Sequence, residues 1–162
     1  MVKTLVFIHG LESTSQGVKG KFFRQYFPGM IIEDYTGNFA ERMRKLSRLL
    51  AAKHNLILVG SSYGGLMAAQ FALQNEKLVQ KMILLAPALN LPEFSPTAQQ
   101  QLNIPVIIYH GTDDNIVDPY AVKSIAGKVF RQLEHHLVKD DHSLHKTFPS
   151  LDWEKILETK NI

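Results

Sequence analysis

The chain has 162 residues, of which 45% are hydrophobic, so it can bury one sizeable core but is too short for two ordinary domains. We therefore predict one domain over residues 1–162. The net charge of +3 is mild, and the sequence has no dense basic stripe with stacking aromatics, which argues against nucleic acid as a partner. The absence of cysteine excludes a disulfide framework and a thiolate nucleophile.

Nothing in the sequence indicates export or a membrane span. Residues 1–8 carry one positive charge and an apolar run, but the run is shorter than the core of a signal peptide and leads into His9-Gly10 without a cleavage site. No stretch approaches the length that a bilayer requires. The sequence predicts a soluble cytoplasmic protein and leaves its oligomeric state open.

Continuous apolar runs recur along the chain and predict strands that are buried on both faces. They cover residues 4–8, 30–32, 56–59, 82–86 and 104–109, and a less regular run at 133–138 is expected to be the last strand. Helical periodicity marks residues 18–27, 38–53, 63–75, 119–130 and 151–159. Because strands and helices alternate, we predict an α/β fold with a mostly parallel sheet of about six strands and helices on both faces.

The third predicted strand leads directly into Gly60-Ser61-Ser62-Tyr63-Gly64, and a predicted helix follows. A G-x-S-x-G sequence in this context forms a strained turn in which small residues let strand and helix approach closely, and the serine hydroxyl is exposed above the sheet. Only Ser62 has glycines two positions before and after it. Ser62 is therefore the candidate nucleophile.

Polar residues also follow three other predicted strands. They are His9-Gly10 after the first strand, residues 110–114 after the fifth and Asp141-His142 after the last. Because the carboxyl ends of parallel strands share one edge of the sheet, these loops are expected to meet Ser62. A serine needs a histidine to take its proton, and that histidine needs a carboxylate to orient it, so these loops supply every part of a serine-histidine-acid triad.

In the order serine, acid, histidine, these motifs resemble the alpha/beta-hydrolase family over nearly the whole chain. The matching pieces are His9-Gly10, the pentapeptide around Ser62, residues 111–117 and Asp141-His142. The chain is most similar to very small intracellular serine esterases, without the two leading antiparallel strands or an inserted cap domain. The resemblance implies a minimal single-domain alpha/beta-hydrolase fold and a serine hydrolase of the carboxylesterase or thioesterase type.

The family pattern of glycine, two residues, aspartate, two residues and valine selects Asp114, between Gly111 and Val117, as the orienting acid. Asp113 is a close rival. Asp118 precedes Pro119 and is explained as the N-cap of a helix.

Of the seven histidines, His142 lies in the loop after the last predicted strand, where the base is expected. His145 is the alternative, because loop registers cannot be fixed from sequence. The histidines that end or lie inside predicted strands are His9, His110, His135 and His136. We expect His9 and His110 to shape their loops rather than act as bases.

The resemblance implies an oxyanion hole made by the backbone N–H groups of Tyr63 and Leu11. The expected mechanism is attack by Ser62 on an ester or thioester carbonyl, with His142 as base and Asp114 holding the imidazole. It needs no cofactor, and the scattered histidines have no metal-ligand spacing.

Substrate selection depends on loops whose geometry the sequence leaves open. Leu89, Phe94 and Ile116 are candidates to line the substrate site. The segment 87–103 is short and has no cap, which predicts an open site that favours small or surface-presented acyl groups. Two alternatives to hydrolysis stay open at this point: a non-catalytic alpha/beta-hydrolase-like binding domain, and an acyltransferase that uses the same triad.

Overall fold

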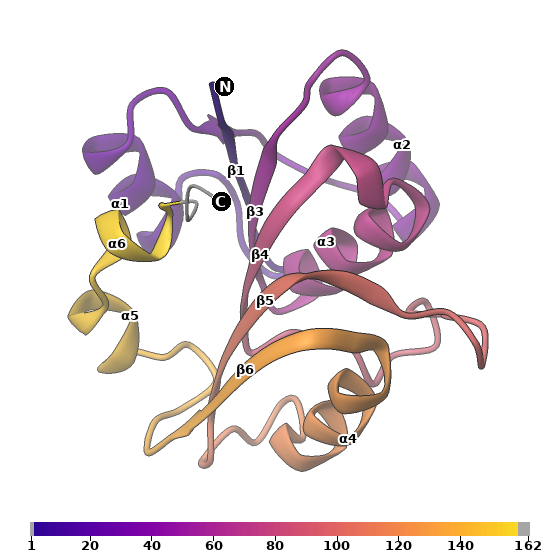
Figure 1. The fold of residues 1–162 in the computed structure, drawn as a ribbon. Coiled ribbons are helices and arrows are strands. Elements are labelled where there is room, and N and C mark those ends of the chain that lie inside the picture. The colour runs from indigo at the N-terminus through magenta and orange to yellow at the C-terminus, as the bar shows by residue number, and fades with distance from the viewer. Residues whose placement is uncertain (1, 159–162) are drawn as a thin grey trace.

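The computed structural model describes residues 2–158, and its centre is one six-stranded sheet with the strand order β2-β1-β3-β4-β5-β6 (Figure 1). The strands are β1 (Thr4–Ile8), β2 (Ile31–Ile32), β3 (Leu56–Ser61), β4 (Val79–Leu85), β5 (Leu102–Gly111) and β6 (Phe130–Val138). Every neighbouring pair is parallel. The prediction of an α/β fold with a parallel sheet of about six strands is confirmed.

Helices cover both faces of the sheet, as predicted, and divide the core into two clusters. One face carries α2 (Phe39–Leu50), α3 (Tyr63–Gln74) and α4 (Pro119–Val129); the other carries α1 (Val18–Tyr26), α5 (Thr147–Ser150) and α6 (Trp153–Ile156) (Figure 1). Successive side chains of a strand point to opposite faces. In β3, Leu58 therefore packs under α3, whereas Ile57 and Val59 pack with the aromatic residues of α1, α5 and α6.

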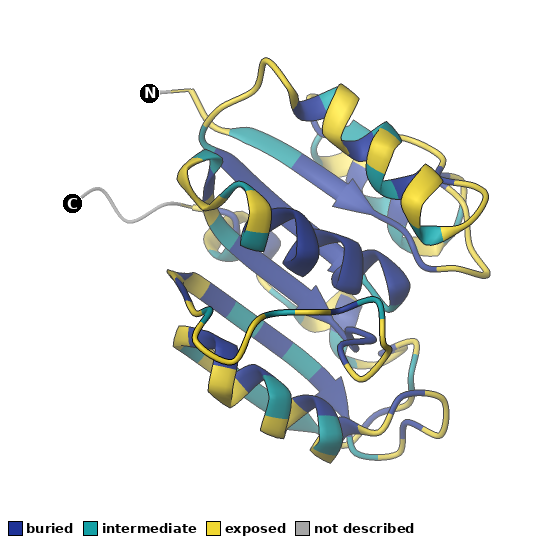
Figure 2. Ribbon diagram, turned by 90° about the vertical axis from the view of Figure 1, so that its right-hand side faces the viewer, coloured by how far each residue is buried: buried dark blue, intermediate teal, exposed yellow. Residues whose placement is uncertain are grey.

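Helix α3 is the most buried helix, and it starts at the end of β3. Its alanine-rich sequence lets it lie close to the sheet, and its residues from Tyr63 to Ala72 are all buried. Figure 2 shows α3 in the colour of buried residues along most of its length, whereas α2 and α4 each keep an exposed stripe. The segment after the candidate nucleophile is thus held by packing on all sides.

The predicted helix over residues 151–159 is wrong in its length. Among the described residues of that range the structure has the short helix α6, the separate helix α5 ends before the range begins, and residue 159 lies outside the described residues. The helix begins later than predicted because Leu151 is extended and the Asp152 side chain accepts a hydrogen bond from the Lys155 amide, which makes Asp152 the N-cap of α6. A 3-10 turn, η1 (Glu76–Leu78), also precedes β4.

Among residues 2–158, no helix is long and apolar enough to cross a membrane.

Candidate active site

Ser62 sits at the turn between β3 and α3 with φ of 54° and ψ of −115°. A positive φ is unfavourable for a residue with a side chain, so the surrounding structure must hold it. A Cβ on Gly64 would lie 2.1 Å from the Ile8 carbonyl oxygen, and one on Gly60 would lie 2.5 Å from the Gly64 carbonyl oxygen. The two glycines of the motif are therefore required because β1, β3 and α3 meet here without space for side chains.

Backbone hydrogen bonds fix the same turn from both sides. The Ser62 amide donates to the Leu85 carbonyl at the end of β4 at 2.9 Å, and its carbonyl accepts from the Ala88 amide at 3.0 Å. These bonds leave the Ser62 hydroxyl as the polar group that faces outward, where it lines a cavity.

The structure brings Ser62, His142 and Asp114 together, from three loops at the carboxyl edge of the sheet. The Ser62 Oγ lies 3.0 Å from the His142 Nε2, and the His142 Nδ1 lies 2.7 Å from the Asp114 Oδ2. Because an ionised carboxylate only accepts hydrogen bonds, the His142 Nδ1 carries the proton and its Nε2 is free to accept from the serine hydroxyl. This geometry can transfer a proton from Ser62 to His142.

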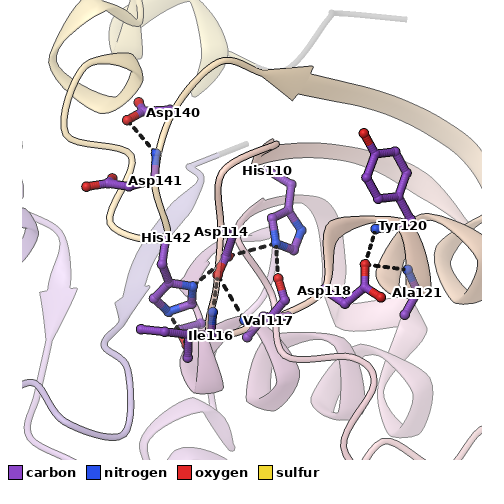
Figure 3. A network of polar contacts seen from close by, with 11 residues as sticks. His110, Asp114, Ile116, Val117, Asp118, Tyr120, Ala121, Asp140, Asp141 and His142 are labelled. Atoms are coloured by element: carbon purple, nitrogen blue, oxygen red, sulfur yellow. Dashed lines mark hydrogen bonds and ion pairs between the residues drawn. The ribbon is translucent and has the colours of Figure 1, made fainter.

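The Asp114 carboxylate is buried and fully hydrogen-bonded. Its Oδ1 accepts from the amides of Ile116 and Val117, each at 2.9 Å (Figure 3). Burial acts to raise the pKa of this carboxyl, but these amides and His142 outweigh burial and hold the pKa below its usual value. Asp114 therefore stays negatively charged beside His142.

His110 donates to the same Asp114 oxygen, a contact that sequence reasoning missed. The His110 Nε2 lies 2.9 Å from the Asp114 Oδ2 and 3.2 Å from the Val117 carbonyl, and its side chain is fully buried. Burial lowers the pKa of His110 despite the nearby carboxylate, so the ring is neutral and acts as a donor through Nε2. In Figure 3 the Asp114 carboxylate lies between the rings of His110 and His142. The Gly-x-x-Asp spacing alone gave no signal for this bond.

The rival residues have other partners. Asp113 is exposed and pairs with Lys139 at 2.8 Å. The Asp118 side chain accepts from amides in the first turn of α4, as expected of an N-cap (Figure 3). His145 is exposed, and its Nδ1 contacts the Asp141 carboxylate.

The loop after β1 lies against the Ser62 turn, since a Cβ on Gly10 would come within 3.4 Å of the Ser62 Cβ. Leu11 and Tyr63, whose amides we predicted to form the oxyanion hole, both line the cavity beside Ser62. Within residues 2–158, neither of these two amides donates a hydrogen bond to the protein. The role of these two amides as the oxyanion hole stays a prediction.

His9 holds the peptide plane that carries the Leu11 amide. Its Nδ1 donates to the Gly10 carbonyl at 2.7 Å, and its Nε2 accepts from the Tyr35 amide at 2.9 Å. Because a trans peptide is planar, fixing the Gly10 carbonyl also fixes the direction of the Leu11 N–H. Burial lowers the pKa of His9, which keeps the ring in the neutral form that makes both bonds.

The cavity at Ser62 has a volume of about 730 Å³. Ile116, predicted to line the substrate site, does line it and is 71% exposed. Leu89 and Phe94 do not line it: both are buried in the core cluster on the face that α2, α3 and α4 cover, and the segment after β4 is hydrogen-bonded to α3 at Gln70 and Leu73. The structure thus corrects the prediction for these two residues. Instead, Val18, Phe22 and Phe148 line the cavity, and no sequence motif marks them.

In the described part of the chain, no group of three or more His, Cys, Asp or Glu side chains is arranged to hold a metal ion.

Comparisons with known proteins agree with this fold. A family profile described as alpha/beta hydrolase fold matches residues 12–102. A search of curated protein sequences finds no match.

Among solved structures, alpha/beta hydrolase domain-containing protein 10 from mouse superposes with a TM-score of 0.71 at 21% identity, over 88% of this chain and 83% of that chain. An esterase from a Rhodococcus species superposes with a TM-score of 0.68 at 16% identity, over 95% of this chain and 88% of that chain. A monoacylglycerol lipase from Paleococcus ferrophilus superposes with a TM-score of 0.68 at 14% identity, over 88% of this chain and 86% of that chain. At these identities the similarity concerns the fold.

Proposed function

Since this chain belongs to the alpha/beta hydrolase family, we propose that it is a serine hydrolase that cleaves a carboxylic ester or thioester through an acyl-enzyme on Ser62. The observation that carries the proposal is the continuous hydrogen-bonded line from the Ser62 Oγ through His142 to Asp114, at 3.0 Å and 2.7 Å. A hydroxyl, an imidazole and an ionised carboxylate in this order form the device that activates a serine.

In the first half of the proposed reaction, the Ser62 Oγ attacks the carbonyl carbon as its proton passes to the His142 Nε2. Asp114 stabilises the resulting imidazolium through the Nδ1–H bond. The C–O or C–S bond to the leaving group then breaks, and the proton on Nε2 goes to the departing alcohol or thiol. The acyl group stays on Ser62 as an ester.

In the second half, water takes the place of the leaving group. His142 accepts a proton from the water, the resulting hydroxide attacks the acyl carbon, and the Ser62 oxygen leaves with the proton from Nε2. In this proposal the amides of Leu11 and Tyr63 bind the oxyanion in both halves. Losing one such donor typically lowers kcat by about a hundred- to thousandfold.

A fluorophosphonate with a small alkoxy group tests the proposal directly, because it reacts with an activated serine. We expect one phosphonyl adduct by intact mass on the parent, none on Ser62→Ala and one on the matched control Ser61→Ala. Before labelling, the parent should hydrolyse short p-nitrophenyl esters, and formation of the adduct should abolish this activity. An unlabelled parent contradicts the proposal and favours the ligand-binding alternative.

The products distinguish hydrolysis from acyl transfer. With an ester substrate and an added alcohol or thiol, a hydrolase releases mainly the free acid. Preferential formation of a new ester or thioester would instead assign an acyltransferase that uses the same residues.

A further inference from the structure

The cavity at Ser62 is lined in part by residues of α1 and α5. These two helices cover the same face of the sheet (Figure 1). The lining of this part of the cavity comes from β1, α1, α5 and the loop after β6. The apolar residues of this part, which we name the α1–α5 pocket, are Phe7, Val18, Phe22, Leu144, Phe148 and Pro149.

The walls of the α1–α5 pocket belong to the packed core. Phe7, Leu144 and Phe148 are at most 4% exposed and are members of the second core cluster. The rings of Phe22 and Phe148 meet edge to face with centroids 5.1 Å apart. Such contacts hold Phe22, which stays partly exposed, in a fixed position against this packed core.

Lys19, which lines the same cavity, is held at the edge of this surface. The Lys19 Nζ donates to the Ser143 carbonyl at 2.8 Å and lies 5.4 Å from the centre of the Phe148 ring. Because the side chains that define the α1–α5 pocket are apolar, water beside them finds few hydrogen-bond partners, and an apolar group would displace it at little cost.

The mouth of the cavity is apolar as well. Val18 is 82% exposed and Leu11 is 49% exposed, and both line the cavity. Apolar side chains gathered on a surface around a concave site are typical of binding regions. A ligand that covers them would remove this surface from water.

We propose that the α1–α5 pocket binds an apolar chain of the substrate, so that the protein acts on esters or thioesters of medium-length alkyl or arylalkyl groups. The inference rests on the proposed function, because the chain must be attached to a carbonyl that Ser62 can reach. A volume of about 730 Å³ is sufficient for such a ligand. The absence of a cap predicted a preference for small acyl groups, but α1 and α5 supply the apolar walls without a cap.

Two series of esters test the inference. One varies the acyl chain of p-nitrophenyl esters from acetate to decanoate, and the other varies the alcohol of alkyl acetates from methyl to octyl. In one of the two series kcat/KM should rise by about fourfold for each methylene group that becomes buried, until the pocket is full. A flat profile in both series overturns the inference.

Val18→Asp places a charge at the mouth of the pocket without disturbing the fold. Val18 is the first residue of α1, whose first turn has no acidic residue, so an aspartate there favours the helix. We expect the long-chain esters to lose about tenfold in kcat/KM relative to acetate, because their chains must pass a carboxylate. The matched control is Val2→Asp, at a position that is 90% exposed and away from the cavity, and it should retain the parent profile.

Labelling by the small fluorophosphonate separates the two ways to fail. If all three proteins are labelled but Val18→Asp keeps the chain-length profile of Val2→Asp, the pocket inference is wrong and the proposed function stands. If the parent is not labelled, the proposed function fails and the inference fails with it.

Discussion

The two halves of the candidate active site are held by different means. Backbone geometry holds Ser62, whose φ of 54° depends on glycines in contact with neighbouring backbone. Side-chain hydrogen bonds hold the other half, in which Asp114 accepts from two amides and two histidines. Because the backbone segments at Ser62 are in direct contact, one added side chain should displace the whole turn. A hydrogen-bonded network can lose one member, and the protein then keeps part of its activity.

The largest effect is expected at Gly64. In Gly64→Ala the added Cβ would lie 2.1 Å from the Ile8 carbonyl oxygen and 2.5 Å from that of His9, so β1 and α3 must separate. Because both are buried backbone segments, we expect loss of fluorophosphonate labelling and a fall in the free energy of unfolding of several kcal/mol, about 2–4. Urea unfolding and intact mass measure the two effects.

Gly127→Ala is the matched control for Gly64→Ala. Gly127 lies within α4, and a Cβ there meets nothing within 4 Å. Alanine in a helix interior should raise the free energy of unfolding by about 0.5–1 kcal/mol and leave labelling unchanged. Equal behaviour of the two variants would contradict the steric account of the motif.

The next largest effect is expected from Asp114→Asn. The amide can still accept from Ile116 and Val117, but its NH₂ group then faces His142 and favours the tautomer with the proton on Nε2. That tautomer cannot accept the proton of Ser62. We expect kcat to fall by about 10⁴ with the protein still folded.

The control for the acid is Asp113→Asn, which removes only the exposed pair with Lys139. It should change kcat by less than about twofold, as is usual for an exposed pair. If Asp113→Asn lost as much activity as Asp114→Asn, our assignment of the acid would be wrong.

His110 gives a smaller and graded effect, which tests whether the network tolerates the loss of one member. His110→Leu removes a donor to the Asp114 carboxylate, and a bond to a charged group contributes about 1.5–3 kcal/mol. We expect kcat to fall by about tenfold with KM unchanged. His110→Gln keeps an N–H donor and should recover part of the loss; equal losses in both would indicate a packing role instead.

The difference between the two halves also explains what the sequence predicts. The turn at Ser62 has no space for a side chain at two fixed positions, so the spacing of Gly60 and Gly64 identifies the turn from the sequence. For the acid and the histidine, several residues of the right type stand close together, and the sequence alone left Asp113 and His145 open as rivals. The structure pairs Asp113 with Lys139 and His145 with Asp141, but the roles of Asp114 and His142 stay predictions.

The parts that the sequence did not predict depend on tertiary packing. Leu89 and Phe94 have the apolar character of a pocket wall, yet the fold buries them in the core cluster that packs with α3. The residues that do line the α1–α5 pocket, such as Phe22 and Phe148, lie far apart in the chain and meet only because α1 and α5 cover the same face. Periodicity identifies apolar positions but does not say which of them stay open to a ligand.

His135 lies on β6 beside the acid half of the site, and its expected effect is on the pH dependence of stability. Both of its ring nitrogens are buried without a hydrogen-bond partner. Burial, with the nearby His110 and Lys123, lowers its pKa from 6.5 to about 4. The unfolded chain therefore binds more protons than the folded protein between these pH values, and stability must fall as the pH drops from 6.5 towards 4.

His135→Phe keeps a ring in place of the imidazole and removes this titration. Its free energy of unfolding, measured by urea titration, should fall less steeply than that of the parent as the pH drops from 6.5 to about 4. The slope should not vanish, since burial lowers the pKa of His9 and His110 as well. His54→Phe, at an exposed position, should follow the parent curve. If His135→Phe also follows the parent curve, the buried imidazole does not contribute to the loss of stability at acid pH.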